Sequence, residues 1–111
     1  MPVWKTDPVH IRSEIMLSRW RIIGLPDGAR HLVGYNRSDA EGRVSSALDT
    51  FDPDRLIGRT RSGRIYQLVG EPSWDADAAY VLDRWSAINK VDPGVIRSLT
   101  VADLADLGPL E

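Results

Sequence analysis

Apolar and polar residues alternate in short runs through most of the first seventy positions, which is the pattern of half-buried β-strands. In the first run, Trp20 and Ile22 lie on one face, and Arg19 and Arg21 lie on the other. Runs at this spacing predict an antiparallel meander of about five strands over residues 17–69, after an irregular lead-in at 1–12. The predicted strands cover residues 17–23, 30–36, 43–51, 56–60 and 64–69.

Three turn sequences and a polar loop at residues 38–42 separate these runs. Pro26-Asp27-Gly28 joins the first two, because proline presets φ and glycine accepts positive φ. Asp52-Pro53-Asp54 fits a type I turn, and Arg61-Ser62-Gly63 fits a three-residue hairpin loop with Gly63 in the left-handed conformation. The turns therefore predict that strands adjacent in the sequence pair with each other.

The hydrophobic period becomes helical after Gly70-Glu71-Pro72. A long helix is predicted over 73–91, with Ser73 or Asp75 as its N-cap. It is expected to cover the apolar face of the sheet, with Trp85 and Tyr80 as its bulkiest contributions. Its apolar face comprises Ala78, Val81, Leu82, Trp85 and Ile88.

A second, shorter helix is predicted over 100–107. Thr100 followed by Asp103 resembles a capping box, and Gly108-Pro109 ends the helix. With both helices at the C-terminal end, the fold class is α+β, in a single domain over residues 1–111.

The composition narrows the class of protein. Its 111 residues suit one domain, and 42% of them are hydrophobic, which is enough for a core. Trp4 and Trp74 fall outside the periodic segments; both are predicted to be core residues, with an exposed aromatic anchor as the alternative. The absence of cysteine excludes disulfides and thiolate sites and favours a cytoplasmic setting. The sequence shows neither a signal-peptide pattern nor an apolar stretch long enough to span a membrane.

Charge is distributed unevenly. The first seventy residues carry 11 Lys and Arg against 8 Asp and Glu, whereas the remainder carries 3 against 8. Arg59, Arg61 and Arg64 are predicted to crowd the tip of the last hairpin, with Arg43 and Tyr66 nearby. Because close cations repel each other, this set needs a counter-charge. The acidic part of the same chain, a protein partner and a nucleic acid are the open alternatives.

The acidic residues after Gly70 form a second candidate surface. Carboxylates on a helical face can mimic the phosphates that a nucleic-acid-handling protein binds, and those near a helix N-terminus also complement its dipole. The candidate residues are Asp75, Asp77, Asp83, Asp103 and Asp106.

No motif in the sequence indicates catalysis. Ser45, Ser46, His10 and His31 supply residue types for a catalytic triad, but no motif ties them together. The two histidines are isolated, and no metal-ligand spacing occurs. Residues 58–63 lack the Lys-Ser/Thr ending of a phosphate-binding loop. We therefore predict no catalytic residue, no cofactor and no metal site; a minor hydrolase is the weakest alternative.

One part of the sequence resembles a type of short uncharacterised bacterial protein found on chromosomes and mobile elements. The resemblance covers residues 32–89 and is carried by the runs GRVSSALDTFD, TRSGRIYQLVGEP and WDADAAYVLDRW. It implies no activity. Small acidic proteins of mobile elements include inhibitors of host defence such as anti-CRISPR proteins, which is an analogy of size and composition.

The function predicted from the sequence is that of a small non-enzymatic module, a monomer or a homodimer, which inhibits or regulates a protein partner such as a nucleic-acid-handling defence complex. The alternative is a nucleic-acid-binding protein that uses the arginine-rich hairpin.

Overall fold

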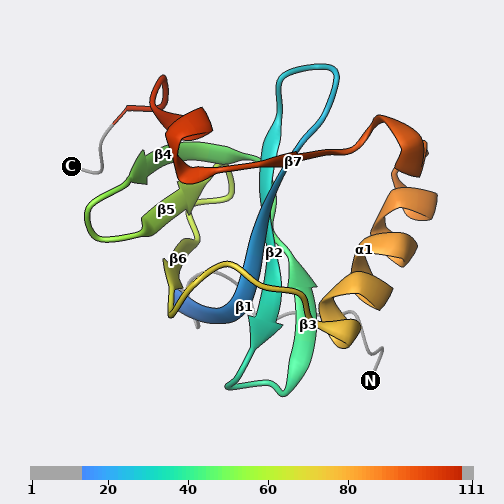
Figure 1. Cartoon of the computed structure of the whole chain (residues 1–111), viewed down its shortest axis with the longest axis horizontal. Helices are drawn as coiled ribbons and strands as arrows, with labels where there is room; N and C mark the ends of the chain where they lie inside the picture. Colours follow the sequence, from blue (N-terminus) through green and yellow to red (C-terminus); the bar gives the residue numbers. More distant parts are fainter. Residues whose placement is uncertain (1–13, 109–111) are drawn as a thin grey trace.

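The computed structural model describes residues 14–108, which form a curled β-sheet with one α-helix on its outer face (Figure 1). The irregular lead-in predicted at 1–12 lies outside this range. No helix within residues 14–108 is long and apolar enough to cross a membrane. In chain order, with η marking a 3₁₀-helix, the elements are β1 (Glu14–Gly24), β2 (Arg30–Asn36), β3 (Glu41–Val44), β4 (Leu48–Asp52), β5 (Ile57–Thr60), β6 (Ile65–Leu68), α1 (Ala76–Ile88), η1 (Pro93–Val95), β7 (Arg97–Leu99) and η2 (Val101–Leu104).

The α+β class is confirmed, but the predicted antiparallel meander is wrong because the sheet is mixed. Its strands follow the order β3-β2-β1-β6-β5-β4, and the central pair, β1 and β6, runs parallel. The two strands at the ends of this order, β3 and β4, are joined by residues 45–47 alone. So short a connection requires the sheet to curl until its two ends approach each other.

Ser45 divides the predicted strand 43–51 into β3 and β4. Its backbone N–H donates to the carbonyl of Leu32 at 2.8 Å, and its hydroxyl accepts from the N–H of Leu32 at 2.8 Å. A side chain thus replaces a backbone carbonyl in the ladder. Two residues later the chain has crossed to β5, and the carbonyl of Ala47 accepts from the N–H of Arg61, the residue that follows β5. The hydrophobic pattern carries no sign of this exchange.

The first strand is longer than the predicted 17–23 because it has different neighbours at its two ends. Its first residues pair with β6, from Glu14 opposite Ile65 onward. Its last residues pair with β7, where Ile22 lies opposite Leu99. The sequence did not predict β7, which crosses over β1 in Figure 1.

Alternate residues of β1 enter two separate cores. Ile22 is buried inside the curl, whereas Ile23 faces α1. Leu104 of η2 contributes to the core inside the curl, called the inner core below. Its buried members are Ile15, Leu17, Trp20, Ile22, Leu32, Leu48, Phe51, Tyr66, Leu68 and Leu104.

The helix covers the outer face of β2 and β3 through a smaller cluster, called the outer core. Ile23, Val33 and Ala78 are its buried members. The first helical turn lies directly on β3, because a Cβ on Gly42 would be 2.3 Å from the carbonyl oxygen of Asp77. This close approach requires glycine at position 42.

The helix is also shorter than the predicted 73–91. Asp75 is its N-cap, with the carboxylate accepting from the N–H of Ala78 at 2.9 Å. Trp85 is half-buried, as expected for a packed residue. Tyr80 and Ile88, in contrast, are 56% and 69% exposed, so their predicted packing against the sheet is wrong.

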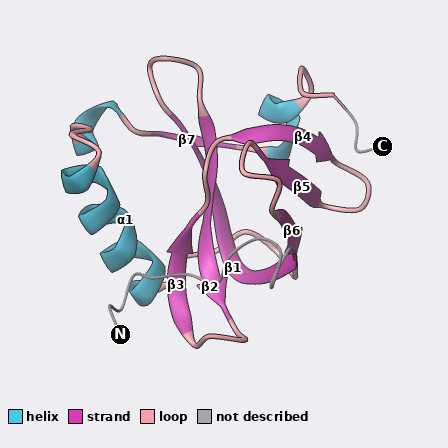
Figure 2. Cartoon of the chain, turned by 180° about the vertical axis from the view of Figure 1, so that it is seen from behind, coloured by secondary structure: helices cyan, strands magenta, loops and turns pink. Residues whose placement is uncertain are grey.

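The predicted second helix, 100–107, is the short 3₁₀-helix η2. Asp103 accepts hydrogen bonds from both the N–H and the hydroxyl of Thr100, at 2.8 and 3.1 Å, as the capping pattern suggested. These hydrogen bonds lower the pKa of Asp103. The following segment returns to the sheet, where Gly108 accepts from the N–H of Phe51 on β4. Figure 2 shows η2 and α1 on opposite sides of the sheet.

Candidate protein-binding surface

The arginines predicted at the hairpin tip lie in different environments. Arg61 is exposed and Arg59 is half-buried, but Arg64 is 5% exposed. Alternate residues Arg64, Tyr66 and Leu68 are all buried, which places Arg64 on the inner face of the sheet. At the hairpin tip where three arginines were predicted, Arg61 is therefore accessible to a partner and Arg64 is not.

Arg43 and Tyr66 form an internal pair. Arg43 Nε donates to the hydroxyl of Tyr66 at 2.8 Å, and its guanidinium carbon lies 5.7 Å from the ring centroid. Tyr66 is 2% exposed. The pair connects β3 to β6, and so links the two halves of the curled sheet. Burial removes Tyr66 from the surface on which it was predicted to contact a partner.

The five acidic residues predicted to form one face lie in separate places. Asp75 is 7% exposed and is occupied as the N-cap of α1. Asp77 and Asp83 are exposed on α1, whereas Asp103 and Asp106 belong to the η2 region, across the sheet (Figure 2). The residues between 14 and 108 therefore hold no continuous acidic face built from this set.

Within residues 14–108, ion pairs connect the basic first part of the chain with its acidic second part. Arg19 Nε lies 3.0 Å from a carboxylate oxygen of Asp75. Arg30 donates through both terminal nitrogens to Asp106, and this hydrogen bonding lowers the pKa of Asp106 and raises the pKa of Arg30. Internal neutralisation, one of the alternatives left open by the sequence, thus occurs at two arginines outside the predicted set.

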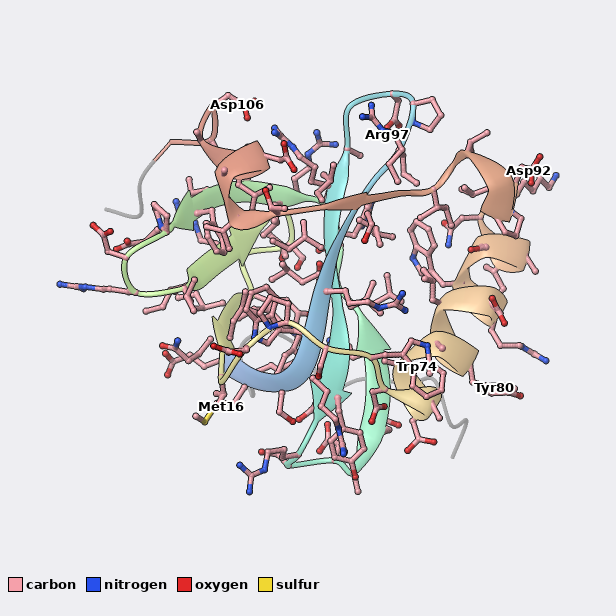
Figure 3. The ribbon with its side chains drawn as sticks, viewed as in Figure 1. Met16, Trp74, Tyr80, Asp92, Arg97 and Asp106 are labelled. Carbon is pink, nitrogen blue, oxygen red and sulfur yellow. The ribbon has the colours of Figure 1, made fainter. Side chains whose placement is uncertain are left out.

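Large apolar side chains are exposed at the N-terminal end of α1. Trp74 is 63% exposed, and Tyr80, on the second helical turn, is 56% exposed. Figure 3 shows both at this end of the helix. The prediction that Trp74 is a core residue is wrong, and the alternative of an exposed aromatic is correct; Trp4 lies outside the described residues. The position of Trp74 outside the helical period was the one signal in the sequence for its exposure.

The loop that presents Trp74 is fixed to the sheet. Trp20 Nε1 donates to the carbonyl of Gly70 at 3.1 Å, and the carbonyl of Trp20 accepts from the N–H of Ser73 at 3.1 Å. Immediately after Trp74, Asp75 caps the helix. The indole therefore projects from a segment held on both sides, while its own surface stays accessible.

Arg19 lies beside this loop in a β-bulge that the sequence did not reveal. Ser18 pairs with Tyr35 and Arg21 with Val33, so Arg19 and Trp20 share a single position on β2. The backbone of Arg19 has a φ of 45°, a left-handed conformation that non-glycine residues rarely adopt.

The side chain of Arg19 is held on two sides. Asp75 binds its Nε, and the ring centroid of Tyr35 lies 5.1 Å from its guanidinium carbon. The side chain is nevertheless 55% exposed. Arg19 and Tyr35 thus lie beside the loop that carries Trp74, and Tyr80 follows on the second turn of α1. These four residues are called the aromatic surface below.

The histidine and serine considered for catalysis have structural partners. His31 Nδ1 donates to the carbonyl of Ser45 at 2.8 Å, and its ring contacts Trp85 edge-on with centroids 4.8 Å apart. The hydroxyl of Ser45 accepts from Leu32 N–H and donates to the carbonyl of Ser46. His10 lies outside the described range. Within residues 14–108, no group of three or more histidine, aspartate and glutamate side chains is placed to hold a metal ion.

No protein-family model, curated protein or solved structure matches this chain.

Proposed function

We propose that this chain is a small protein-interaction module that covers part of a partner protein, with Trp74 at the centre of the contact. The observation that most supports this proposal is that the indole of Trp74 is 63% exposed on a loop fixed to the sheet. Tryptophan, tyrosine and arginine are the residues most enriched at interface hot spots, and the aromatic surface contains all three. Covering the indole would remove a large apolar area from water.

Rigidity of the surface supports this function. Binding costs entropy when loops and side chains must be ordered, so a surface that is already ordered binds more tightly. Gly70 and Ser73 are tied to Trp20, and Arg19 is held by Asp75 and Tyr35. Asp77 and Asp83, exposed on α1, would contribute to a polar rim.

The nucleic-acid alternative receives less support. Arg64 is buried and Arg43 is engaged with Tyr66, which leaves Arg59 and Arg61 of the predicted contact set. The net charge of −2 also opposes association with a polyanion. A defence complex as the partner remains a prediction from the analogy made in the sequence.

Site-specific photo-crosslinking tests the proposal. A photoreactive phenylalanine analogue replaces Trp74 in one variant and Met16 in a matched control, since Met16 is 53% exposed and lies on the other side of the molecule (Figure 3). In the cells that produce the protein, position 74 is expected to yield a discrete crosslinked protein that position 16 does not. In a non-crosslinking assay, Trp74→Ala is expected to weaken recovery of that protein by about tenfold or more.

Two results would contradict the proposal. Equal crosslinking patterns from positions 74 and 16 would show that the aromatic surface has no specific occupant. Nuclease-sensitive recovery that Arg61→Ala abolishes and Trp74→Ala leaves unchanged would favour the nucleic-acid alternative.

A further inference from the structure

We propose that a surface hollow beside Arg19 binds an oxyanion, the carboxylate or phosphoryl group of an acidic side chain. The hollow has a volume of about 310 Å³ and is lined by Ser18, Arg19, Tyr35 and Arg37. Two of these residues are cations and two carry hydroxyls, and none is acidic. The identification of the group as part of a protein partner rests on the proposed function, whereas binding of the anion itself does not.

The bulge determines how Arg19 is presented. Two residues of β1 oppose Gly34 alone, and a Cβ on Gly34 would lie 3.1 Å from the Cα of Trp20. Bulges redirect side chains, and backbone conformations as uncommon as the φ of 45° at Arg19 are concentrated at functional sites. The bulge and this uncommon φ therefore set the orientation of Arg19, which the proposed site uses.

The guanidinium is already oriented before any ligand binds. Asp75 engages Nε at 3.0 Å, and Tyr35 lies against the guanidinium at 5.1 Å. Within residues 14–108, the two terminal nitrogens of Arg19 make no hydrogen bond. They form the planar fork that binds carboxylate and phosphoryl oxygens in pairs, and this fork is lost when arginine is replaced by lysine.

Arg37 supplies the second cation. It lies in the turn after β2, is exposed, and makes no ion pair within the described range. Asp75 is the nearest acidic partner of Arg19, but it is 7% exposed and occupies Nε rather than the fork. The hydroxyls of Ser18 and Tyr35 are further potential donors to an oxyanion.

The position of the hollow specifies the kind of segment it fits. Trp74 directly precedes Asp75, the residue that holds Arg19, so the anion site lies near the loop that carries the exposed indole. A partner segment with an acidic side chain close to an apolar one matches this arrangement. The apolar residue would cover Trp74, while the oxyanion bridges Arg19 and Arg37.

NMR titration of the full chain with inorganic phosphate, and separately with acetate, tests the site directly. We expect saturable shifts of the Arg19 side-chain Nε–H and of the amides of Ser18, Tyr35 and Arg37. Saturation by phosphate alone assigns a phosphoryl group, and saturation by acetate alone or by both assigns a carboxylate-compatible site. Saturation by neither overturns the proposal.

Variants establish which side chains are responsible. Arg37→Ala and Arg19→Lys are each expected to weaken binding at least about tenfold, the latter because it removes the fork while keeping the charge. Arg55→Gln is the matched control, since the Arg55 side chain is 79% exposed and lies 3.9 Å from Asp52 in a distant turn. Equal loss in Arg37→Ala and Arg55→Gln, which each remove one positive charge, would reveal a general charge effect and overturn the site. Crosslinking through Trp74 without anion binding would leave the proposed function standing and remove this inference alone.

Discussion

The inner and outer cores of this protein differ in how they hold their elements together. Among residues 14–108, ten buried apolar side chains fill the inner core, whereas three belong to the outer core, which attaches α1. Polar contacts compensate in the outer core: Asp75 caps the helix and pairs with Arg19, and His31 contacts Trp85. We therefore expect the curled sheet to contribute most of the free energy of unfolding, while the helix and its N-terminal loop present an accessible surface.

The difference also explains where apolar side chains are exposed. A helix with a full packed face would bury Ile88 and Tyr80, which the sequence pattern predicted. Because the outer core is small, both remain at the surface, together with Trp74. The apolar residues that the outer core does not use are thus available to a partner.

The largest expected effect is the loss of an aromatic side chain from the inner core. Phe51 is 2% exposed and belongs to the ten-residue cluster. Phe51→Ala should lower the free energy of unfolding by about 3–5 kcal/mol, through lost burial and the cavity that remains. Urea unfolding followed by far-UV circular dichroism measures this loss. Ile88→Ala, on the exposed side of α1, is the control; if the two variants lose the same stability, the comparison of the cores is wrong.

A methyl group at position 42 tests how α1 is seated. The Cβ of alanine would lie 2.3 Å from the carbonyl oxygen of Asp77 and 2.5 Å from the nitrogen of Ala78, both backbone atoms. The first helical turn must shift, and we expect Gly42→Ala to destabilise the protein by about 1–3 kcal/mol. Hydrogen exchange should accelerate in α1 more than in the strands around Phe51. Gly108→Ala, with no atom within 4 Å of the added Cβ, is the control.

Much of the local structure could be predicted from the sequence. The strand at 30–36 has the bounds that were expected, and Gly28 and Gly63 both adopt the positive φ that their turns require. Asp75 was one of two candidate N-caps and is the one used. These features depend on residues close together in the sequence, where propensity and turn chemistry act directly.

The features that depend on distant residues could not be predicted. Parallel pairing of β1 with β6 joins segments about fifty residues apart, and no periodicity encodes it. The bulge at Arg19 arises where β2 supplies Gly34, so it depends on the partner strand. The aromatic surface depends on the parallel pairing and on the bulge. Asp75 reaches Arg19 only because the segment between β6 and α1 crosses β1. The sequence therefore offered an exposed Trp74 as an alternative, but the arrangement of Arg19 and Tyr35 beside it could not be predicted.

A smaller effect is expected from removing the polar connection between α1 and the bulge. Asp75→Ala loses the N-cap and the ion pair with Arg19, which should cost about 0.5–2 kcal/mol. Asp75→Asn retains a capping oxygen but not the charge, so it should recover the cap's share of the stability. Thermal unfolding of both variants separates the two contributions. If Asp75→Asn is as unstable as Asp75→Ala, the ion pair rather than the cap fastens the helix.

The smallest effect is a pH dependence of the outer core. Burial lowers the pKa of His31, against the raising influence of its hydrogen bond to the Ser45 carbonyl and of Asp27, while Arg61 lowers it further. The unfolded chain therefore binds a proton at His31 more readily than the folded protein does. The neutral His31 side chain therefore contributes fully to the free energy of unfolding above the ordinary histidine pKa of about 6.5, and this contribution is lost as the pH falls below that value.

A His31→Gln variant isolates this contribution, because it removes one titratable side chain and leaves every other one in place. Urea unfolding at intervals from about pH 7.5 to about pH 5 should show a steeper loss of stability in the wild type than in the variant. Hydrogen exchange should locate the loss in α1, since protonation disturbs the ring between Ser45 and Trp85. Identical pH profiles would show that His31 titrates as freely in the folded protein as in the unfolded chain, and that the outer core does not sense its charge.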